Sequence, residues 1–123
     1  MSLFHPTPGQ IYDRISILKL KIDAYTKAKK NTETLTTELR DCEGKVHRES
    51  SAEISFLINS LHETNSELWD CEDLVRMLPA PQQYFLADLA VRIARLNDLR
   101  SNLIRQIDSV GFCANHTEEK IYS

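Results

Sequence analysis

The sequence predicts an all-α fold, an up-down four-helix bundle, on three observations. Apolar residues recur at helical spacings of three and four along most of the chain, and no segment alternates as a strand does. Short polar connections separate four such periodic stretches, so consecutive helices are expected to run antiparallel. The 123 residues suit a single domain, 1–123, with one core.

The first helix is expected at 8–29. Thr7, Pro8 and Gln10 are typical of a helix start, with threonine as the cap, proline in the first turn and glutamine completing a capping box. This helix has two apolar sides. One side consists of Ile11, Ile15, Leu18, Ile22 and Tyr25, and the other of Ile17, Leu20 and Ala24. The second side has no obvious partner within a four-helix bundle, so we expect a homodimer formed through it.

The second and third helices are expected at 32–47 and 51–78. The second is the weaker, because Gly44 and four threonines lower its helix propensity. Ser50, with Glu53 three residues later, predicts a second capping box at the start of the third helix.

The fourth helix is expected at 81–110. Pro79 ends the preceding helix, Pro81 suits an early helical position, and Gly111 is the expected stop. The third and fourth helices then form an antiparallel hairpin roughly 40 Å long. The polar tail 112–123 either frays or docks on the bundle.

Seven side chains that carry polar groups fall on or beside the apolar faces of these helices. A buried charge without a partner costs several kcal/mol, so such residues must be paired or must line a wet site. We take them as the candidate binding residues: Asp13, Asn65, Trp69, Glu72, Arg76, Asn97 and Arg100. Asp13 is expected to find a cation on another helix or in a second subunit.

A tight hairpin turn places residues whose numbers sum to about 160 at the same level. Asn65 then lies near the level of Asn97 and within reach of Arg100, which gives one polar layer. Glu72 is too far from Arg100 and is expected to pair with Arg76, four residues on, as a second layer nearer the turn.

These layers have two interpretations. As structural features they fix register and partner choice, as an inward asparagine does in coiled coils. As a functional site they form a small pocket for an anion or polar ligand, with the arginines binding carboxylate or phosphate.

The acidic residues of the third helix invite comparison with helical magnesium-dependent nucleotide pyrophosphatases. Of Glu67, Asp70, Glu72 and Asp73, only Glu72 is expected to face inward, whereas a magnesium site needs several convergent carboxylates. The histidines and cysteines lack metal-ligand spacing, and neither a glycine-rich phosphate loop nor a nucleophile-elbow motif occurs. We therefore expect no metal and no cofactor, while a serine–histidine or cysteine–histidine pair stays open.

The net charge of −3 gives no general attraction to nucleic acid or to an anionic membrane, and no apolar run is long enough to cross a bilayer. Residues 1–31 are net positive and residues 51–78 net negative, either because the two segments are neighbours or because each is a solvated face. Three cysteines without a Cys-x-x-Cys pair, and a start without a signal peptide, predict a cytoplasmic protein.

Four segments, in order, resemble a small bacterial family known as a domain of unknown function. They are Gly9–Leu18, Asn65–Arg76, Asn97–Arg100 and Glu118–Tyr122. In that order they resemble its glycine-acid-x-x-Asp-basic-Ile-Thr-Ile-Leu, Asn-x-x-Leu-Trp-x-x-Glu-Asp-x-x-Arg, Asn-Asp-x-Arg and Glu-Glu-Lys-x-Tyr motifs. Gln10 and Ile121 depart from its pattern.

The resemblance implies a helical domain without an assigned activity. Similar domains accompany glycosyltransferase-type proteins, which implies an accessory or interaction role. It also implies that Glu118, Glu119 and Lys120 dock on the bundle.

We therefore expect a cytoplasmic interaction or ligand-binding module that forms a homo-oligomer or binds a protein partner or a small anion. The alternative is a small enzyme acting on phosphorylated or nucleotide-like substrates. Its site would consist of Asn65, Glu72, Arg76, Asn97 and Arg100.

Overall fold

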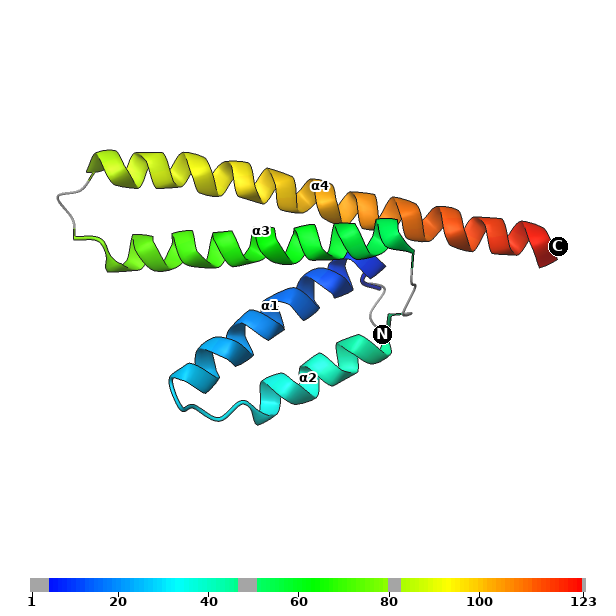
Figure 1. Cartoon of the computed structure of the whole chain (residues 1–123), viewed down its shortest axis with the longest axis horizontal. Coiled ribbons are helices and arrows are strands. Elements are labelled where there is room, and N and C mark those ends of the chain that lie inside the picture. Colours follow the sequence, from blue (N-terminus) through cyan, green and yellow to red (C-terminus); the bar gives the residue numbers. More distant parts are fainter. Residues whose placement is uncertain (1–4, 47–50, 80–82, 123) are drawn as a thin grey trace.

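The chain forms four helices. The computed structural model describes the backbone of residues 5–46, 51–79 and 83–122, and the side chains of 5–46, 51–79 and 84–110. The helices are α1 (Pro8–Lys27), α2 (Glu33–Gly44), α3 (Ala52–Met77) and α4 (Gln83–Tyr122) (Figure 1). The described residues contain no strand, so the all-α prediction is confirmed.

The packing of these helices is uneven. α3 and α4 form a long antiparallel hairpin, α1 packs against both, and within the described residues α2 packs against α1 alone (Figure 1). Among the described side chains, the hydrogen bonds between α1 and the hairpin reach α3 only up to Asn65 and α4 only from Arg100 onward. Beyond these residues α1 diverges from the hairpin. We call residues 67–79 and 84–99, toward the α3–α4 turn, the open half of the hairpin.

The hairpin register agrees with the expected one. Arg92 of α4 donates to Glu67 of α3 at 2.9 Å, and these numbers sum to 159. On the side of the hairpin away from the turn, Leu57 and Leu61 of α3 pack with Leu103 and Ile107 of α4 as the main core cluster. Each such buried aliphatic side chain stabilises the fold by about 2 kcal/mol relative to exposure. This main cluster therefore lies in the part of the hairpin that α1 covers, while Leu68, Cys71 and Leu89 are buried in the open half.

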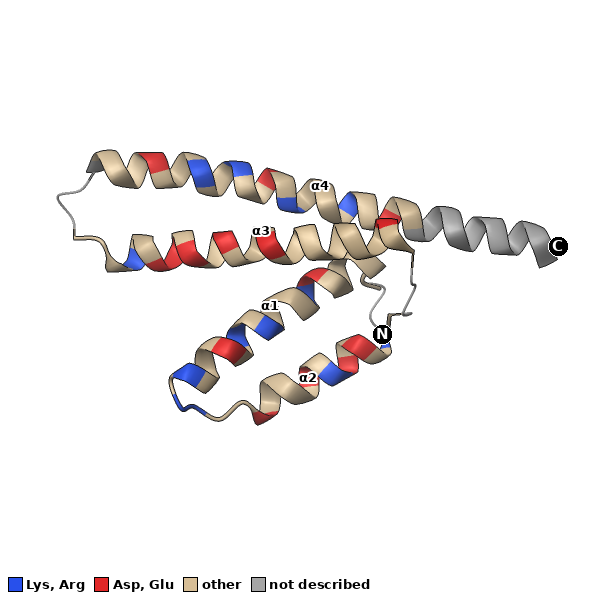
Figure 2. Ribbon diagram, in the orientation of Figure 1, with Lys and Arg blue, Asp and Glu red and all other residues tan. Residues whose placement is uncertain are grey.

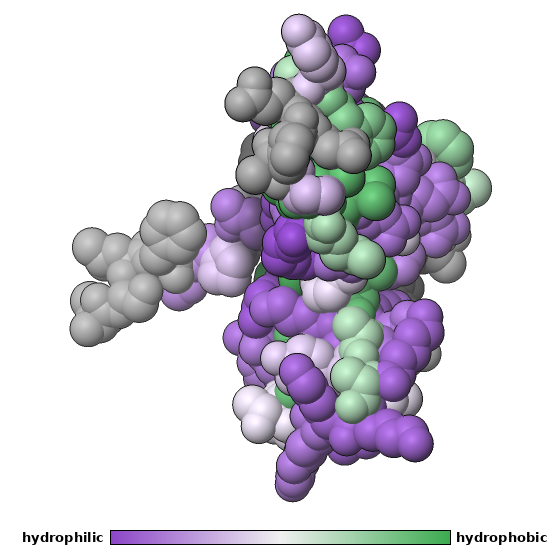
Figure 3. Space-filling model, turned by 90° about the vertical axis from the view of Figure 1, so that its left-hand side faces the viewer, coloured by the Kyte–Doolittle hydropathy of each residue, from purple (hydrophilic) through white to green (hydrophobic). Residues whose placement is uncertain are grey.

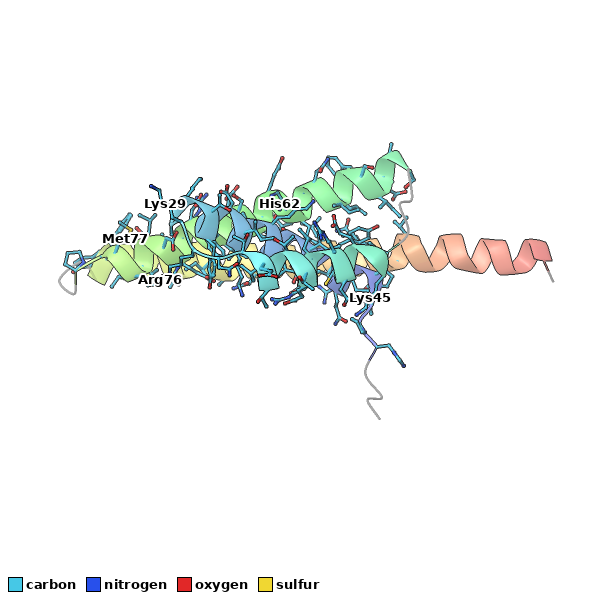
Figure 4. All side chains as sticks on the ribbon, turned by 90° about the horizontal axis from the view of Figure 1, so that it is seen from below. Lys29, Lys45, His62, Arg76 and Met77 are labelled. Atoms are coloured by element: carbon cyan, nitrogen blue, oxygen red, sulfur yellow. The ribbon has the colours of Figure 1, made fainter. Side chains whose placement is uncertain are left out.

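α1 begins as predicted and ends differently. Thr7 accepts from the Gln10 amide at 3.2 Å, and the Gln10 side chain accepts from the Thr7 amide at 2.9 Å, which completes the capping box. At the other end the Lys30 amide donates a hydrogen bond to the Tyr25 carbonyl at 2.8 Å. Lys29, which Figure 4 labels, is the residue before Lys30 and has a φ of 56°, in the left-handed region. This is a Schellman closure in which a lysine stands where glycine is usual.

Two boundary predictions were wrong. The N-cap of α3 is Ser51, whose hydroxyl accepts from the Ile54 amide at 3.1 Å, and not Ser50. Gly111 does not end α4, which continues to Tyr122. A single glycine costs a helix about 1 kcal/mol, which its neighbours can outweigh when no capping geometry follows. The expected docking of the tail residues 118–120 lies outside the described side chains.

The second apolar side of α1 is partly buried within the chain. Ile17, Leu20 and Ala24 are half-buried within the chain. They share a sector of the α1 helical wheel with Gly9, Asp13 and Ser16, which contact the hairpin. The large exposed hydrophobic side chains lie mainly on α3 and α4 instead. In the described part of the chain, no helix has the length and apolar content needed to cross a membrane.

Candidate functional site

Asp13 is the centre of a polar network that joins three helices. Its Oδ1 accepts from Asn65 Nδ2 at 3.0 Å and from Arg100 Nε at 2.9 Å, and its Oδ2 accepts from Arg100 Nη2 at 2.5 Å. Asp13 is 8% exposed and Asn65 4%. The expected cation for Asp13 therefore lies on another helix of the same chain, and the predicted inward position of Asn65 and Arg100 is confirmed.

The charged and polar groups of this network are paired with one another. The hydrogen bond to Asp13 raises the pKa of Arg100 above its ordinary value, although burial opposes this. Among the described side chains, every buried nitrogen and oxygen has a hydrogen-bond partner. A bidentate arginine–carboxylate pair of this kind is directional and holds its partners in one geometry. Asp13 therefore fixes where α1 sits along the hairpin.

Next to this network, Ser16 of α1 meets His62 of α3, with Oγ and Nδ1 2.7 Å apart. Sequence reasoning left a serine–histidine pair open without identifying this one. The signal was present in the spacing, because Ser16 follows Asp13 by three residues and His62 precedes Asn65 by three. Ser16 is buried and His62 half-buried, so the pair is a contact between α1 and α3.

Three of the predicted inward residues are exposed. Glu72, Arg76 and Asn97 lie on the open half of the hairpin, where α1 no longer covers the helices. Arg76 pairs with Asp73 and not with Glu72. Figure 4 shows Arg76 near the turn end of α3, well along the helix from His62. The inward assignment was wrong here because a helical wheel gives the direction of a side chain but not how far the covering helix extends.

The remaining predicted residue, Trp69, is half-buried and lies in the open half. The seven predicted residues therefore do not form one pocket. Asp13, Asn65 and Arg100 form the network, whereas the others stand on a surface that continues from it toward the turn. Whether that surface binds a ligand stays a prediction.

Sequence reasoning missed a groove between α3 and α4 in the open half. It encloses about 920 Å³. Its apolar lining includes Leu74, Phe85, Leu89, Leu96 and Leu99, and its charged lining Glu67, Asp70, Asp88, Arg92 and Arg95. The signal was available in the helical spacing of positions 85, 89, 92, 96 and 99, which share one side of α4.

The groove lies away from α1. Arg95 and Leu99 are each five residues before Arg100 and Ile104, which contact α1, so they point about 140° away from that side of α4. Glu67 is likewise five residues after His62 on α3. One face of the hairpin therefore holds α1, and the opposite face carries the groove.

Exposed apolar side chains concentrate in the same region. Of the nine large hydrophobic side chains exposed in the described part of the chain, seven lie in the open half: Leu74, Val75, Met77, Tyr84, Phe85, Val91 and Leu99. Seen from this end of the molecule, hydrophobic residues gather on the α3/α4 tip, while the α1/α2 end is mainly hydrophilic (Figure 3). Exposed apolar side chains that concentrate on one part of a surface are typical of interaction sites in proteins.

A second charged contact holds α2 to α1. Arg14 donates to both oxygens of Glu38, from Nε at 2.5 Å and from Nη2 at 2.9 Å. The hydrogen bond from Arg14 lowers the pKa of Glu38 below its ordinary 4.5. Both side chains are 41% exposed, so solvent screens the pair and its contribution to stability is about 0.5 kcal/mol.

This pair predicts a small pH dependence. A carboxylate whose pKa is lowered by folding stabilises the fold above pH 4.5, and the contribution is lost as the pH falls through the folded-state pKa. Urea unfolding at pH 7 should show Glu38→Gln to be less stable than the parent by about 0.5 kcal/mol. The difference should shrink toward zero at pH 3, and an equal difference at both pH values would contradict the assignment.

Within the described residues, no group of three or more histidine, cysteine, aspartate or glutamate side chains is placed to hold a metal ion. Comparison with protein-family models, with curated proteins and with solved structures gave no match. The resemblance of the four motifs to a bacterial helical family therefore stays a prediction.

Proposed function

We propose that this protein is a non-enzymatic interaction module that binds a protein partner through the groove face of its α3/α4 hairpin. The carrying observation is the concentration of exposed apolar side chains on the open half, around a groove that no other described helix covers. Burying such surface on association is favourable by roughly 25 cal/mol per Å² before the cost of association is subtracted.

The Asp13 network supports this function indirectly. By binding Asn65 and Arg100 at one level, it anchors α1 at the middle of the hairpin. Because α1 is fixed at that position, it does not extend over the open half (Figure 1). This is the register-fixing interpretation of the polar layer, applied within one chain.

The alternative function, an enzyme acting on phosphorylated or nucleotide-like substrates, has less support. Its best anion-binding group is Arg100, whose Nε and Nη2 are already bound by Asp13. A phosphate would have to displace a bidentate carboxylate before it could bind there. The other expected members, Glu72, Arg76 and Asn97, stand exposed on the open half.

We assign the module to the bacterial cytoplasm. Cys42 and Cys71 are free thiols on separate helices, which suits a reducing compartment. Burial raises the pKa of the Cys42 thiol, which keeps it in the less reactive protonated form.

Site-directed photocrosslinking in cells that produce the full chain tests the proposed function. A photoreactive residue at Phe85, in the groove, should give a discrete crosslinked product, and one at the exposed Arg40 of α2 should give none. Adding Leu74→Asp, which places a charge in the groove, should remove the product. No product from position 85, or equal products from both positions, would overturn the proposal.

A thermal-shift screen separates the two functions further. Nucleotides, sugar phosphates and divalent cations at 1 mM should leave the Tm unchanged. A ligand present at a hundred times its Kd stabilises the folded state by about 2.7 kcal/mol, so a specific small-molecule site would be visible. A rise in Tm that Arg100→Leu abolishes would favour the enzyme.

A further inference from the structure

We infer that the partner of the groove face is a second copy of this chain, so that two hairpins pair face to face into an intermolecular four-helix bundle. This inference rests on the proposed function and names the partner. Three observations carry it: the shape of the face, the distribution of charge across it, and its area.

The shape of the face suits another hairpin. The open half consists of two antiparallel helices with an apolar groove between them, as in one half of a four-helix bundle from which the other half has been removed. A two-fold axis parallel to the helices places α3 of each copy against α4 of the other, antiparallel and at the same level. α1 lies on the opposite face of the hairpin and does not obstruct this approach.

The charges select this arrangement. Of the charged residues that line the groove, α3 contributes the acidic Glu67 and Asp70, whereas α4 contributes Arg92 and Arg95 and one acid, Asp88. In the open half, Figure 2 shows acidic positions mainly along α3 and basic positions mainly along α4. In the described part of the chain Arg92 pairs with Glu67, while Arg95 and Asp70 form no ion pair. Placing α3 against the partner's α4 brings Asp70 to the level of the partner's Arg92 and Arg95 close to the level of the partner's Glu67. An axis perpendicular to the helices would instead place acid against acid.

The area is sufficient for a reversible dimer. Residues 84–99 span about 24 Å, and two helices side by side are about 20 Å wide, so each copy presents roughly 500 Å² of projected face. The two faces together give roughly 1,000 Å² of projected area, and the uneven surface of the side chains adds to the area that is buried. This approaches the roughly 1,200 Å² at which stable interfaces begin. We therefore expect a dimer with a Kd in the micromolar range.

Charge reversal tests the pairing. Variant A carries Glu67→Lys and Asp70→Lys, and variant B carries Arg92→Glu and Arg95→Glu. Sedimentation analysis of the full chain from 1 to 300 µM should show the parent passing from 14.2 kDa to twice that mass. A alone and B alone should each associate at least tenfold more weakly, because like charges then face each other on both sides of the axis. An equimolar mixture of A and B should recover association at least to the parent level.

Each contrary result has a definite meaning. A parent that stays monomeric at 300 µM overturns the inference. Unchanged association of A alone overturns the pairing of α3 with the partner's α4. It would instead fit α3 facing α3, where the parent has acid against acid and A has lysine against lysine. Thermal unfolding of A and B beside the parent shows whether either variant has lost its fold, and a folded A that associates as the parent does still overturns the pairing.

The photocrosslinking experiment separates this inference from the proposed function. A product from position 85 with twice the chain mass, formed with the chain itself, supports both. A product with a different protein keeps the proposed function and overturns the self-association. No product overturns both.

Discussion

Asp13→Asn should lower the free energy of unfolding by about 3 kcal/mol, since breaking a buried charge pair leaves its partner uncompensated. Asparagine keeps the shape of the side chain but removes the charge that Arg100 binds with two nitrogens. The Arg100 side chain is only 32% exposed, so water replaces the lost partner incompletely. Urea unfolding followed by circular dichroism measures the change.

Glu38→Gln is the matched control for this prediction. It also removes the carboxylate of a bidentate arginine pair, but at a site 41% exposed, and it should cost about 0.5 kcal/mol. Arg100→Met combined with Asp13→Asn should cost at least 1 kcal/mol less than the sum of the two single changes, because no buried charge is then left unpaired. Simple additivity, or an equal effect of the Asp13 and Glu38 changes, would show that the network does not hold α1.

Gly9→Ala should destabilise the protein by about 2–3 kcal/mol, the upper part of the range typical of overpacking. A Cβ at this position would lie 2.5 Å from the carbonyl oxygen of Ile104, 2.9 Å from Asp108 Oδ1 and 3.0 Å from Ile104 Cγ2. The nearest of these atoms belongs to the backbone of α4 and cannot rotate away. The Gly9 amide also donates to Asp108 at 2.7 Å, and displacement of α1 would lengthen this bond.

Gly44→Ala is the natural comparison, because a Cβ on Gly44 of α2 meets nothing within 4 Å. Alanine there should stabilise the protein by up to about 1 kcal/mol through helix propensity alone. Parallel thermal melts of the two variants give the result. If both alanines shift the Tm in the same direction, the close approach of α1 to α4 at Gly9 is not a tight contact.

The part of the hairpin that α1 covers was predictable from the sequence, because it depends on capping residues and on apolar spacings within single helices. Thr7 and Gln10 form the expected capping box, and the periodicity of the apolar residues places Leu57, Leu61, Leu103 and Ile107 in the core. Glu67 and Arg92 show the expected hairpin register, since short connections leave antiparallel helices few alternatives. An inward asparagine and arginine on facing helices likewise predicted a polar layer.

The amino-acid sequence alone determined the helices, the hairpin and the presence of a buried polar layer, because spacing along a helix fixes which side chains share a face. Only the tertiary structure decided which cation Asp13 binds and how far α1 follows the hairpin. It thereby decided that Asn65 is buried while Glu72, Arg76 and Asn97 meet water. The physical reason is that burial depends on how far the neighbouring helix extends. That is a long-range property, and the helical spacing of apolar residues does not contain it.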